Sequence, residues 1–197
     1  MSEGKAQKVK AVDEGLVDAL TVVEAPSPAI LAEQLEEAFK QGDIVKTALL
    51  CWHLLSLEPG SGVARIYLKK LMRDPEVAQL NRATIKKMGR DSDAEERWED
   101  LCGLAAIGLL KEPADRFYTL MMAQGASGMA RTDIIDAALS QFPDPAADDI
   151  DMLNAKAAWA HDKGDYEKAS EYFSKLIEAR PDLVGLKLNL ATSLAGA

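Results

Sequence analysis

Two histidines and two cysteines are the side chains of this chain best suited to bind a metal ion or to act as nucleophiles. A zinc site needs several such groups at close spacing, and a reactive cysteine needs neighbours that lower its pKa. Neither His53 nor His161 has a second histidine or cysteine at ligand spacing. Cys51 and Cys102 lie in apolar stretches typical of buried thiols. We therefore expect packed or surface histidines, structural cysteines and no metal site.

Two further stretches have the composition of ligand-binding loops but lack the required spacing. "QGASGMA" (124–130) is glycine-rich, yet no Lys-Ser/Thr follows it and no predicted strand precedes it, so we expect a turn between helices. "DPAADDID" (144–151) carries four aspartates without the alternating spacing and glycine of a calcium loop. We expect these aspartates to stabilise the start of the following helix. The chain by itself is predicted to have no cofactor and no enzymatic activity.

The composition favours a globular, helical protein. Of 197 residues, 48% are hydrophobic and only 6% aromatic, which suits helices better than sheets. The net charge of -9 repels phosphate backbones, so nucleic acid is not an expected partner. No uninterrupted apolar stretch reaches the length of a membrane span, and the N-terminus lacks the apolar core of a signal peptide. With no disulfide framework, we expect a cytoplasmic protein.

One frame recurs along the sequence: a glycine followed by a proline 17 positions later. Three copies have it, namely Gly42 with Pro59, Gly128 with Pro145, and Gly164 with Pro181. Such regular self-similarity indicates an array of short helical units. In the last copy, small residues at Ala157 and Ala169 would let two antiparallel helices approach closely, and Phe173 would fill the space towards the next pair.

Residues 150–183 resemble the tetratricopeptide repeat (TPR) family, at Ala157, Gly164, Tyr166, Ala169, Phe173 and Pro181. Residues 28–61 and 114–147 match it less completely. The resemblance implies an all-α solenoid of stacked antiparallel helix pairs in a right-handed superhelix, with one irregular repeat. Its expected units are 28–61, 62–113 with an insertion, 114–147, 150–183 and a partial unit 184–197, all within an array spanning 28–197. Residues 1–25 are expected to form a capping or contact helix, with an apolar stripe at Val9, Val12, Leu16, Leu20 and Val23.

The resemblance also implies a site, because the first helices of TPR units line a concave face that binds proteins or peptides. Carried over to this sequence, that face would expose Asn154, Ala158, His161, Asp162, Asn189 and Thr192. Asparagine can both donate to and accept from a peptide backbone. The alternative interpretation is that these are ordinary exposed polar positions.

A run of basic residues offers a second candidate surface. It comprises Arg65, Lys69, Lys70, Arg73, Lys86 and Lys87, together with Arg82 and Arg90. An acidic block, "DSDAEERWED" (91–100), follows directly. One interpretation is a basic patch for an acidic partner. The other is that the two blocks face each other within the irregular repeat or are simply solvated.

Three functions remain open from the sequence. The first is a protein interaction module that binds a protein or peptide in the concave groove. The second is the N-terminal substrate-recognition domain of a larger enzyme, such as a bacterial glycosyltransferase. The third is a self-assembling scaffold or homodimer that uses the apolar last helix, with Leu186, Leu188, Leu190 and Leu194, because arrays normally end in a polar outer face.

Overall fold

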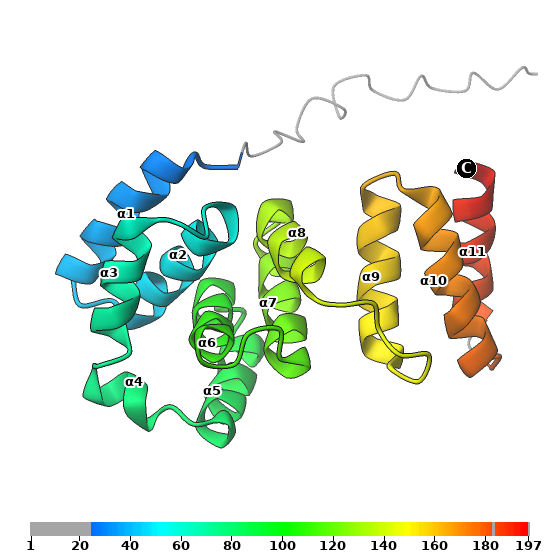
Figure 1. The fold of residues 1–197 in the computed structure, drawn as a ribbon. Helices are drawn as coiled ribbons and strands as arrows, with labels where there is room; N and C mark the ends of the chain where they lie inside the picture. The colour runs from blue at the N-terminus through cyan, green and yellow to red at the C-terminus, as the bar shows by residue number, and fades with distance from the viewer. Residues whose placement is uncertain (1–24, 183, 197) are drawn as a thin grey trace, which may run out of the picture.

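The computed structural model describes residues 25–182 and 184–196, and within them the chain is entirely helical (Figure 1). Eleven helices follow one another through short connections. They are α1 (Pro28–Lys40), α2 (Ile44–Leu57), α3 (Gly62–Leu71), α4 (Pro75–Gln79), α5 (Arg82–Ala94), α6 (Trp98–Lys111), α7 (Arg116–Gly128), α8 (Thr132–Gln141), α9 (Ile150–Asp162), α10 (Tyr166–Ala179) and α11 (Val184–Gly196).

Short polar side chains set where many of these helices begin. Asp43, Asp149 and Asp165 each accept a hydrogen bond from the backbone N–H three residues later, at 2.9, 3.2 and 3.3 Å. Such N-caps satisfy amide groups that have no partner inside the helix. The aspartates of 144–151 thus include the residue that starts α9, as expected.

The helices repeat with a period of 34 residues. Helices α5, α7, α9 and α11 begin at residues 82, 116, 150 and 184, each 34 after the one before. Their partners α6, α8 and α10 begin at 98, 132 and 166 with the same spacing. The pair α1 and α2 begins at 28 and 44, so it lies 54 residues before α5 and α6. The irregular repeat therefore contains 20 additional residues, 62–81, which hold α3 and α4.

The turn between the two helices of each pair explains why the glycine-to-proline spacing places the third unit two residues too early. The residue with left-handed backbone is Gly42, Glu96, Ala130 and Gly164 in turn, with φ between 54° and 75°. Glycine adopts this conformation readily, whereas glutamate and alanine adopt it at a cost. Gly128 is instead the last residue of α7. The third unit consequently begins at residue 116, two residues after the boundary expected at 114.

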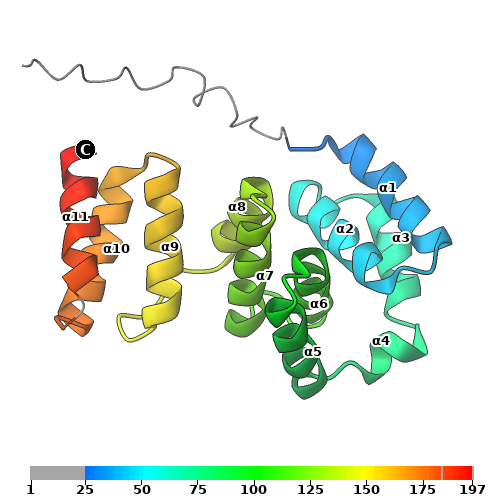
Figure 2. The ribbon, with the colours of Figure 1, turned by 180° about the vertical axis from the view of Figure 1, so that it is seen from behind.

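Neighbouring helices pack as pairs, and the pairs follow one another in a row (Figures 1 and 2). The most extensive packing joins α9 to α10 within a pair, and α6 to α7 and α2 to α6 between pairs. Helix α6 also packs directly on α2, so the insertion with α3 and α4 lies beside the row and does not separate its units. Helix α3 covers α2 and contacts α1.

Three hydrophobic cores hold this row together. The largest one joins α2 to α5–α8 and includes Ile85, Ile107 and Met122, which are fully buried. A second core, between α1, α2 and α3, is centred on Leu35 and Cys51. A third lies between α9, α10 and α11 and contains Ala157, Ala169 and Phe173, the three packing positions expected from the last copy of the repeat.

The all-helical fold built of paired, neighbouring helices is thus confirmed. No helix among residues 25–182 and 184–196 has the length and apolar character needed to cross a membrane. The capping helix predicted within residues 1–25 falls almost wholly outside the described residues.

Candidate binding groove between α5 and α7

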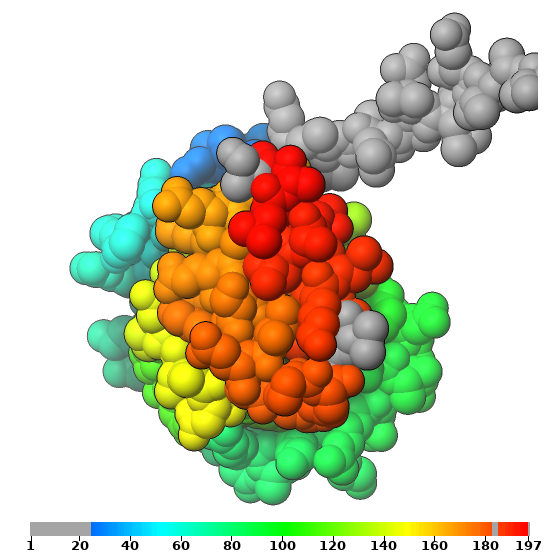
Figure 3. All heavy atoms as spheres, turned by 90° about the vertical axis from the view of Figure 1, so that its right-hand side faces the viewer, coloured from blue at the N-terminus to red at the C-terminus, as the bar shows by residue number. Residues whose placement is uncertain are grey.

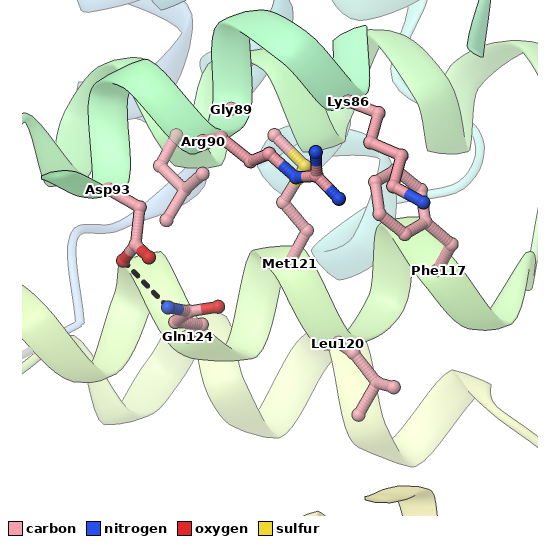
Figure 4. A pocket seen from close by; sticks show the side chains of 9 residues that line it. Lys86, Gly89, Arg90, Asp93, Phe117, Leu120, Met121 and Gln124 are labelled. Carbon is pink, nitrogen blue, oxygen red and sulfur yellow. Dashed lines mark hydrogen bonds between the residues drawn. The ribbon is translucent and has the colours of Figure 1, made fainter. Parts of the chain in front are cut away.

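A hollow of about 180 Å³ lies between α5 and α7, the first helices of two consecutive 34-residue units (Figure 4). Its lining combines an apolar floor with polar and basic walls. The lining residues are Lys86, Gly89, Arg90, Asp93, Leu101, Phe117, Leu120, Met121 and Gln124.

The floor of this groove depends on the absence of a side chain at Gly89. A Cβ at this position would lie 2.7 Å from the terminal methyl carbon of Met121, closer than unbonded carbon atoms approach. The thioether of Met121 therefore fills the space beneath α5, where it also lies near Leu101. Methionine is flexible and polarizable, so it adapts to differently shaped apolar partners. The floor is well suited to an apolar side chain of variable shape.

The walls of the groove carry two exposed cations. Lys86 and Arg90 stand one helical turn apart on α5, and both are exposed. No carboxylate oxygen of the described residues lies within 4.0 Å of either side-chain cation. Figure 4 shows both side chains extending over the opening, Lys86 towards Phe117. At the other end Gln124 donates a hydrogen bond to Asp93 at 2.7 Å, which closes the groove.

The predicted basic run does not pair with the acidic block that follows it. Among its eight members only Arg82 forms ion pairs within the described residues, with Asp115 at 2.7 Å and Glu112 at 3.7 Å. The acidic block makes its contacts elsewhere: Arg97 pairs with Glu95 and Asp100, and Lys46 pairs with Glu99 at 3.1 Å. Among the described residues, no ion pair of 4.0 Å or less joins the two blocks, although Asp93 of the acidic block lines the same hollow as Lys86 and Arg90.

The members of the predicted basic patch differ in their surroundings. Arg65 donates a hydrogen bond to the backbone oxygen of Pro59 at 2.9 Å. The ammonium of Lys70 lies 4.8 Å from the ring centre of Phe39 and 4.7 Å from that of Tyr67. The others are exposed on α3, on the turn after it, or on α5: Lys69, Arg73, Lys86 and Lys87. Of the eight residues of the basic run, Lys86 and Arg90 line the groove.

The residues predicted for the concave face lie on α9 and α11, away from the groove lining. Asn154, Ala158 and Asp162 on α9 are exposed, as are Asn189 and Thr192 on α11. The ring of His161 is partly buried, with its Nδ1 3.7 Å from the Asp162 carboxylate, and it packs edge to face with the ring of Tyr166. The hydroxyl of Thr192 donates to the backbone oxygen of Leu188 at 3.0 Å. The hollow between α5 and α7 includes none of them.

A second hollow, of about 430 Å³, lies between α1, α2 and α8 and includes His53 in its lining. His53 is only 1% exposed, and its Nε2 lies 3.5 Å from Oδ2 of Asp133 without a well-aligned hydrogen bond. Arg131 donates two hydrogen bonds to the same carboxylate, at 2.8 and 2.7 Å. Burial lowers the pKa of His53, although the Asp133 charge opposes this. This histidine is packed and neutral in neutral solution.

The cysteines are buried and lie in different cores. The Cys51 thiol donates to the backbone oxygen of Ala64 at 3.2 Å, and Cys102 packs against α7. Burial raises the pKa of both thiols to about 12, so neither is a nucleophile in the folded chain. Among residues 25–182 and 184–196, no three His, Cys, Asp or Glu side chains gather as a metal site requires.

Sequence reasoning found Lys86 but missed most of the groove. Phe117, Met121 and Gln124 follow one another at spacings of four and three on α7, a stripe that also fits a core-facing helix. Such a stripe predicts core positions, yet Phe117 and Leu120 are both partly exposed in the groove. The unusual signal was Gly89 inside a helical pattern, since a glycine there indicates a close approach by another element.

No protein-family model, no curated protein and no solved structure matches this chain. Its resemblance to the TPR family therefore rests on the residues and spacings described above.

Proposed function

We propose that this chain is a non-enzymatic interaction module with a TPR-like, right-handed helical array, and that it binds a protein or peptide segment in the groove between α5 and α7. The period of 34 residues supports the TPR-like part, because this is the length of a TPR unit. The first helices of such units line the concave face, and α5 and α7 are two of them.

The observation that carries the binding proposal is a pair of exposed cations above an apolar floor, neither of which pairs with a carboxylate of residues 25–182 or 184–196. Exposed cations on a surface are common, but here Lys86 and Arg90 border a hollow floored by Met121. A segment that places an apolar side chain on this floor would bring its backbone and flanking groups beside the two cations. Apolar burial would supply affinity, and the charges would select the partner and speed its association.

The experiment is a selection of binding peptides from a randomised library displayed on phage, with the full chain as bait. Selected peptides should be enriched in acidic residues around one large apolar residue. Their affinity for the double variant K86E/R90E should fall at least about tenfold, equivalent to about 1.4 kcal/mol. A matched control is K69E/R73E, which makes the same charge change on exposed residues outside the groove. If both variants lost peptide affinity equally, the loss would reflect only the change in net charge, and the proposed site would be wrong.

The floor gives a second, charge-independent test. Gly89→Ala adds a methyl group that displaces the Met121 side chain from beneath α5. Binding of the selected peptides should weaken, while far-ultraviolet circular dichroism should show the helical content of the wild-type chain. If the selected peptides bound both K86E/R90E and Gly89→Ala as tightly as the wild type, their binding site would lie elsewhere on the chain. The proposal would then be wrong.

A second candidate function, self-association, is favoured by the outer face of α11. Leu188 and Leu194 are 69% and 61% exposed on this helix, and its only charged residue is Lys187. Figure 3 shows the outer surface that α11 forms at this end of the molecule. Two copies could bury these side chains against each other. Sedimentation equilibrium should then give twice the monomer mass of 21.3 kDa, and Leu188→Glu should return the chain to a monomer.

A further inference from the structure

A face that combines apolar and basic side chains lies on α3, outside the groove between α5 and α7. Its aliphatic residues Val63 and Ile66 are 41% and 57% exposed. They stand three residues apart, so they adjoin on one side of the helix. The opposite side of α3 carries Ala64 and Leu71, which are buried against the rest of the chain. Helix α3 is therefore anchored by one apolar side and presents a second one to solvent.

Three basic residues adjoin this exposed apolar pair. Lys69 and Lys70 follow Ile66 at spacings of three and four, which place them on the same side of the helix. Arg73 lies in the turn that ends α3, four residues after Lys69. All three are exposed, and no carboxylate oxygen of the described residues lies within 4.0 Å of their cationic nitrogens. The ammonium of Lys70 lies over the half-buried ring of Tyr67, which adds an aromatic group to the edge of this face.

The charge of this face is opposite to that of the whole chain. Residues 61–73 contain four basic residues and no acidic one, whereas the chain has a net charge of -9. At physiological ionic strength, exposed charges farther apart than about 8 Å are largely screened from each other. An anionic surface that approaches α3 therefore meets mainly the positive charge of this face.

The shape of this face suits a soft surface better than a rigid protein. Helix α3 belongs to the insertion that lies beside the row of helix pairs (Figure 1), and Ile66 projects from it with more than half of its surface exposed. The interface of a bilayer accepts such a projecting aliphatic side chain at the boundary of headgroups and acyl chains. Lysine and arginine stems can extend along the same boundary and hold their charges beside lipid phosphates.

We propose that the outward face of α3 binds the surface of a membrane that contains anionic lipids, with the helix parallel to the bilayer. Val63 and Ile66 enter the boundary between headgroups and acyl chains. Lys69, Lys70 and Arg73 stay at the level of the phosphates, where each cation adds electrostatic attraction. The surface is separate from the groove and gives the chain a second binding function, by which a peptide held between α5 and α7 would be brought to a membrane.

Flotation of the full chain with lipid vesicles tests the attraction. Vesicles of phosphatidylcholine with about 30% phosphatidylserine should bind the chain at least about tenfold more tightly than vesicles of phosphatidylcholine alone. The variant K69E/R73E should lose at least about tenfold in affinity for the anionic vesicles. The control K168E/K187E makes the same charge change on exposed lysines of α10 and α11 and should bind like the wild type. A wild type indifferent to lipid charge, or an equal loss in both variants, would overturn the proposal.

The variant Ile66→Asn tests insertion, because it removes the apolar side chain without a change of charge. Its affinity for the anionic vesicles should fall at least about threefold. The control Met88→Asn removes an apolar side chain of α5 that is 39% exposed, and it should bind like the wild type. Full vesicle binding by Ile66→Asn would show attraction by charge alone, which an acidic protein surface would provide equally well, and the proposal would then be wrong.

A fluorescent label at residue 66 reports the position of this face in the bilayer. Ile66→Cys can be labelled selectively in the folded chain, because burial raises the pKa of the Cys51 and Cys102 thiols to about 12. The emission of an environment-sensitive label should shift to shorter wavelength on anionic vesicles. The same label at Asn154→Cys, on the exposed side of α9, should not shift. An absent shift at residue 66, or equal shifts at both positions, would contradict docking through α3.

These measurements are independent of the peptide-binding function proposed for the groove. The selection of peptides uses no lipid, and K69E/R73E should keep the affinity of the selected peptides while it loses that for anionic vesicles. Failure of vesicle binding would therefore leave the groove proposal standing, and failure of peptide binding would leave the membrane proposal standing.

Discussion

The imidazole Nε2 of His53, on α2, lies 3.5 Å from the carboxylate of Asp133, on α8, and so links the first helix pair to the third. Burial favours the neutral ring and lowers the pKa of His53. Burial also tends to raise the pKa of Asp133, but the hydrogen bonds from Arg131 outweigh it, and this pKa is lower than usual. A neutral histidine therefore stands beside an ionised aspartate that is already paired.

This arrangement predicts a stability that declines in mild acid. The unfolded chain takes up the His53 proton near pH 6.5, whereas the folded chain takes it up only at lower pH. The free energy of unfolding should be fully present above about pH 6.5 and should fall as the pH drops towards the folded pKa. Urea unfolding at a series of pH values measures this decline, and His53→Gln should flatten it. His161→Gln, which changes a partly exposed histidine, is the matched control; a decline unchanged by His53→Gln would contradict the assignment.

The two cysteines should be almost inert while the chain is folded. With their pKa raised to about 12, only about one thiol in 10⁴ is ionised near pH 8. A disulfide reagent should modify Cys51 and Cys102 slowly in native buffer and rapidly in guanidinium chloride. Rapid native modification of either residue would show that its core opens far more readily than its burial indicates.

Two helical glycines should respond oppositely to alanine. A Cβ on Gly103 would overlap the side chain and backbone carbonyl of Val45, where α6 crosses α2. Gly103→Ala should therefore lower the free energy of unfolding by about 2 kcal/mol or more. A Cβ on Gly185, in α11, would meet no atom within 4 Å, so Gly185→Ala should raise it by up to about 1 kcal/mol. Urea unfolding measures the free energy of unfolding of both variants. If the two substitutions changed it equally, α2 and α6 would approach each other less closely in solution than the structure shows.

An ion-pair cluster at the start of α9 should contribute modestly and in a salt-dependent way. Arg116, at the start of α7, donates to Asp149 and Asp151, each at 2.8 Å. Because the guanidinium is nearly half exposed, Arg116→Met should cost only about 0.5–1 kcal/mol at low salt and less at high salt. Arg73→Met, which removes an exposed arginine that forms no ion pair within the described residues, is the control. A cost that is independent of salt would point to lost packing of the side-chain stem instead.

The sequence by itself determined the local structure. The aspartates of 144–151, the recurring glycine-to-proline frame and the small residues Ala157 and Ala169 predicted where helices begin and pair, because these signals act within one or two turns or at a fixed spacing. The left-handed turns at Gly42 and Gly164 were likewise readable, since glycine takes that conformation at little cost.

Only the tertiary structure decided the exact register of the units and the groove. Glu96 and Ala130 make the same left-handed turn as the glycines, and packing of α5 on α6 and of α7 on α8 holds them there against their own preference. For that reason the sequence frame placed the third unit two residues too early, and it predicted an insertion within 62–113 without its bounds of 62–81. The groove joins Lys86 and Arg90 to a stripe on α7 about thirty residues away in sequence, and no local pattern specifies that two such helices lie side by side.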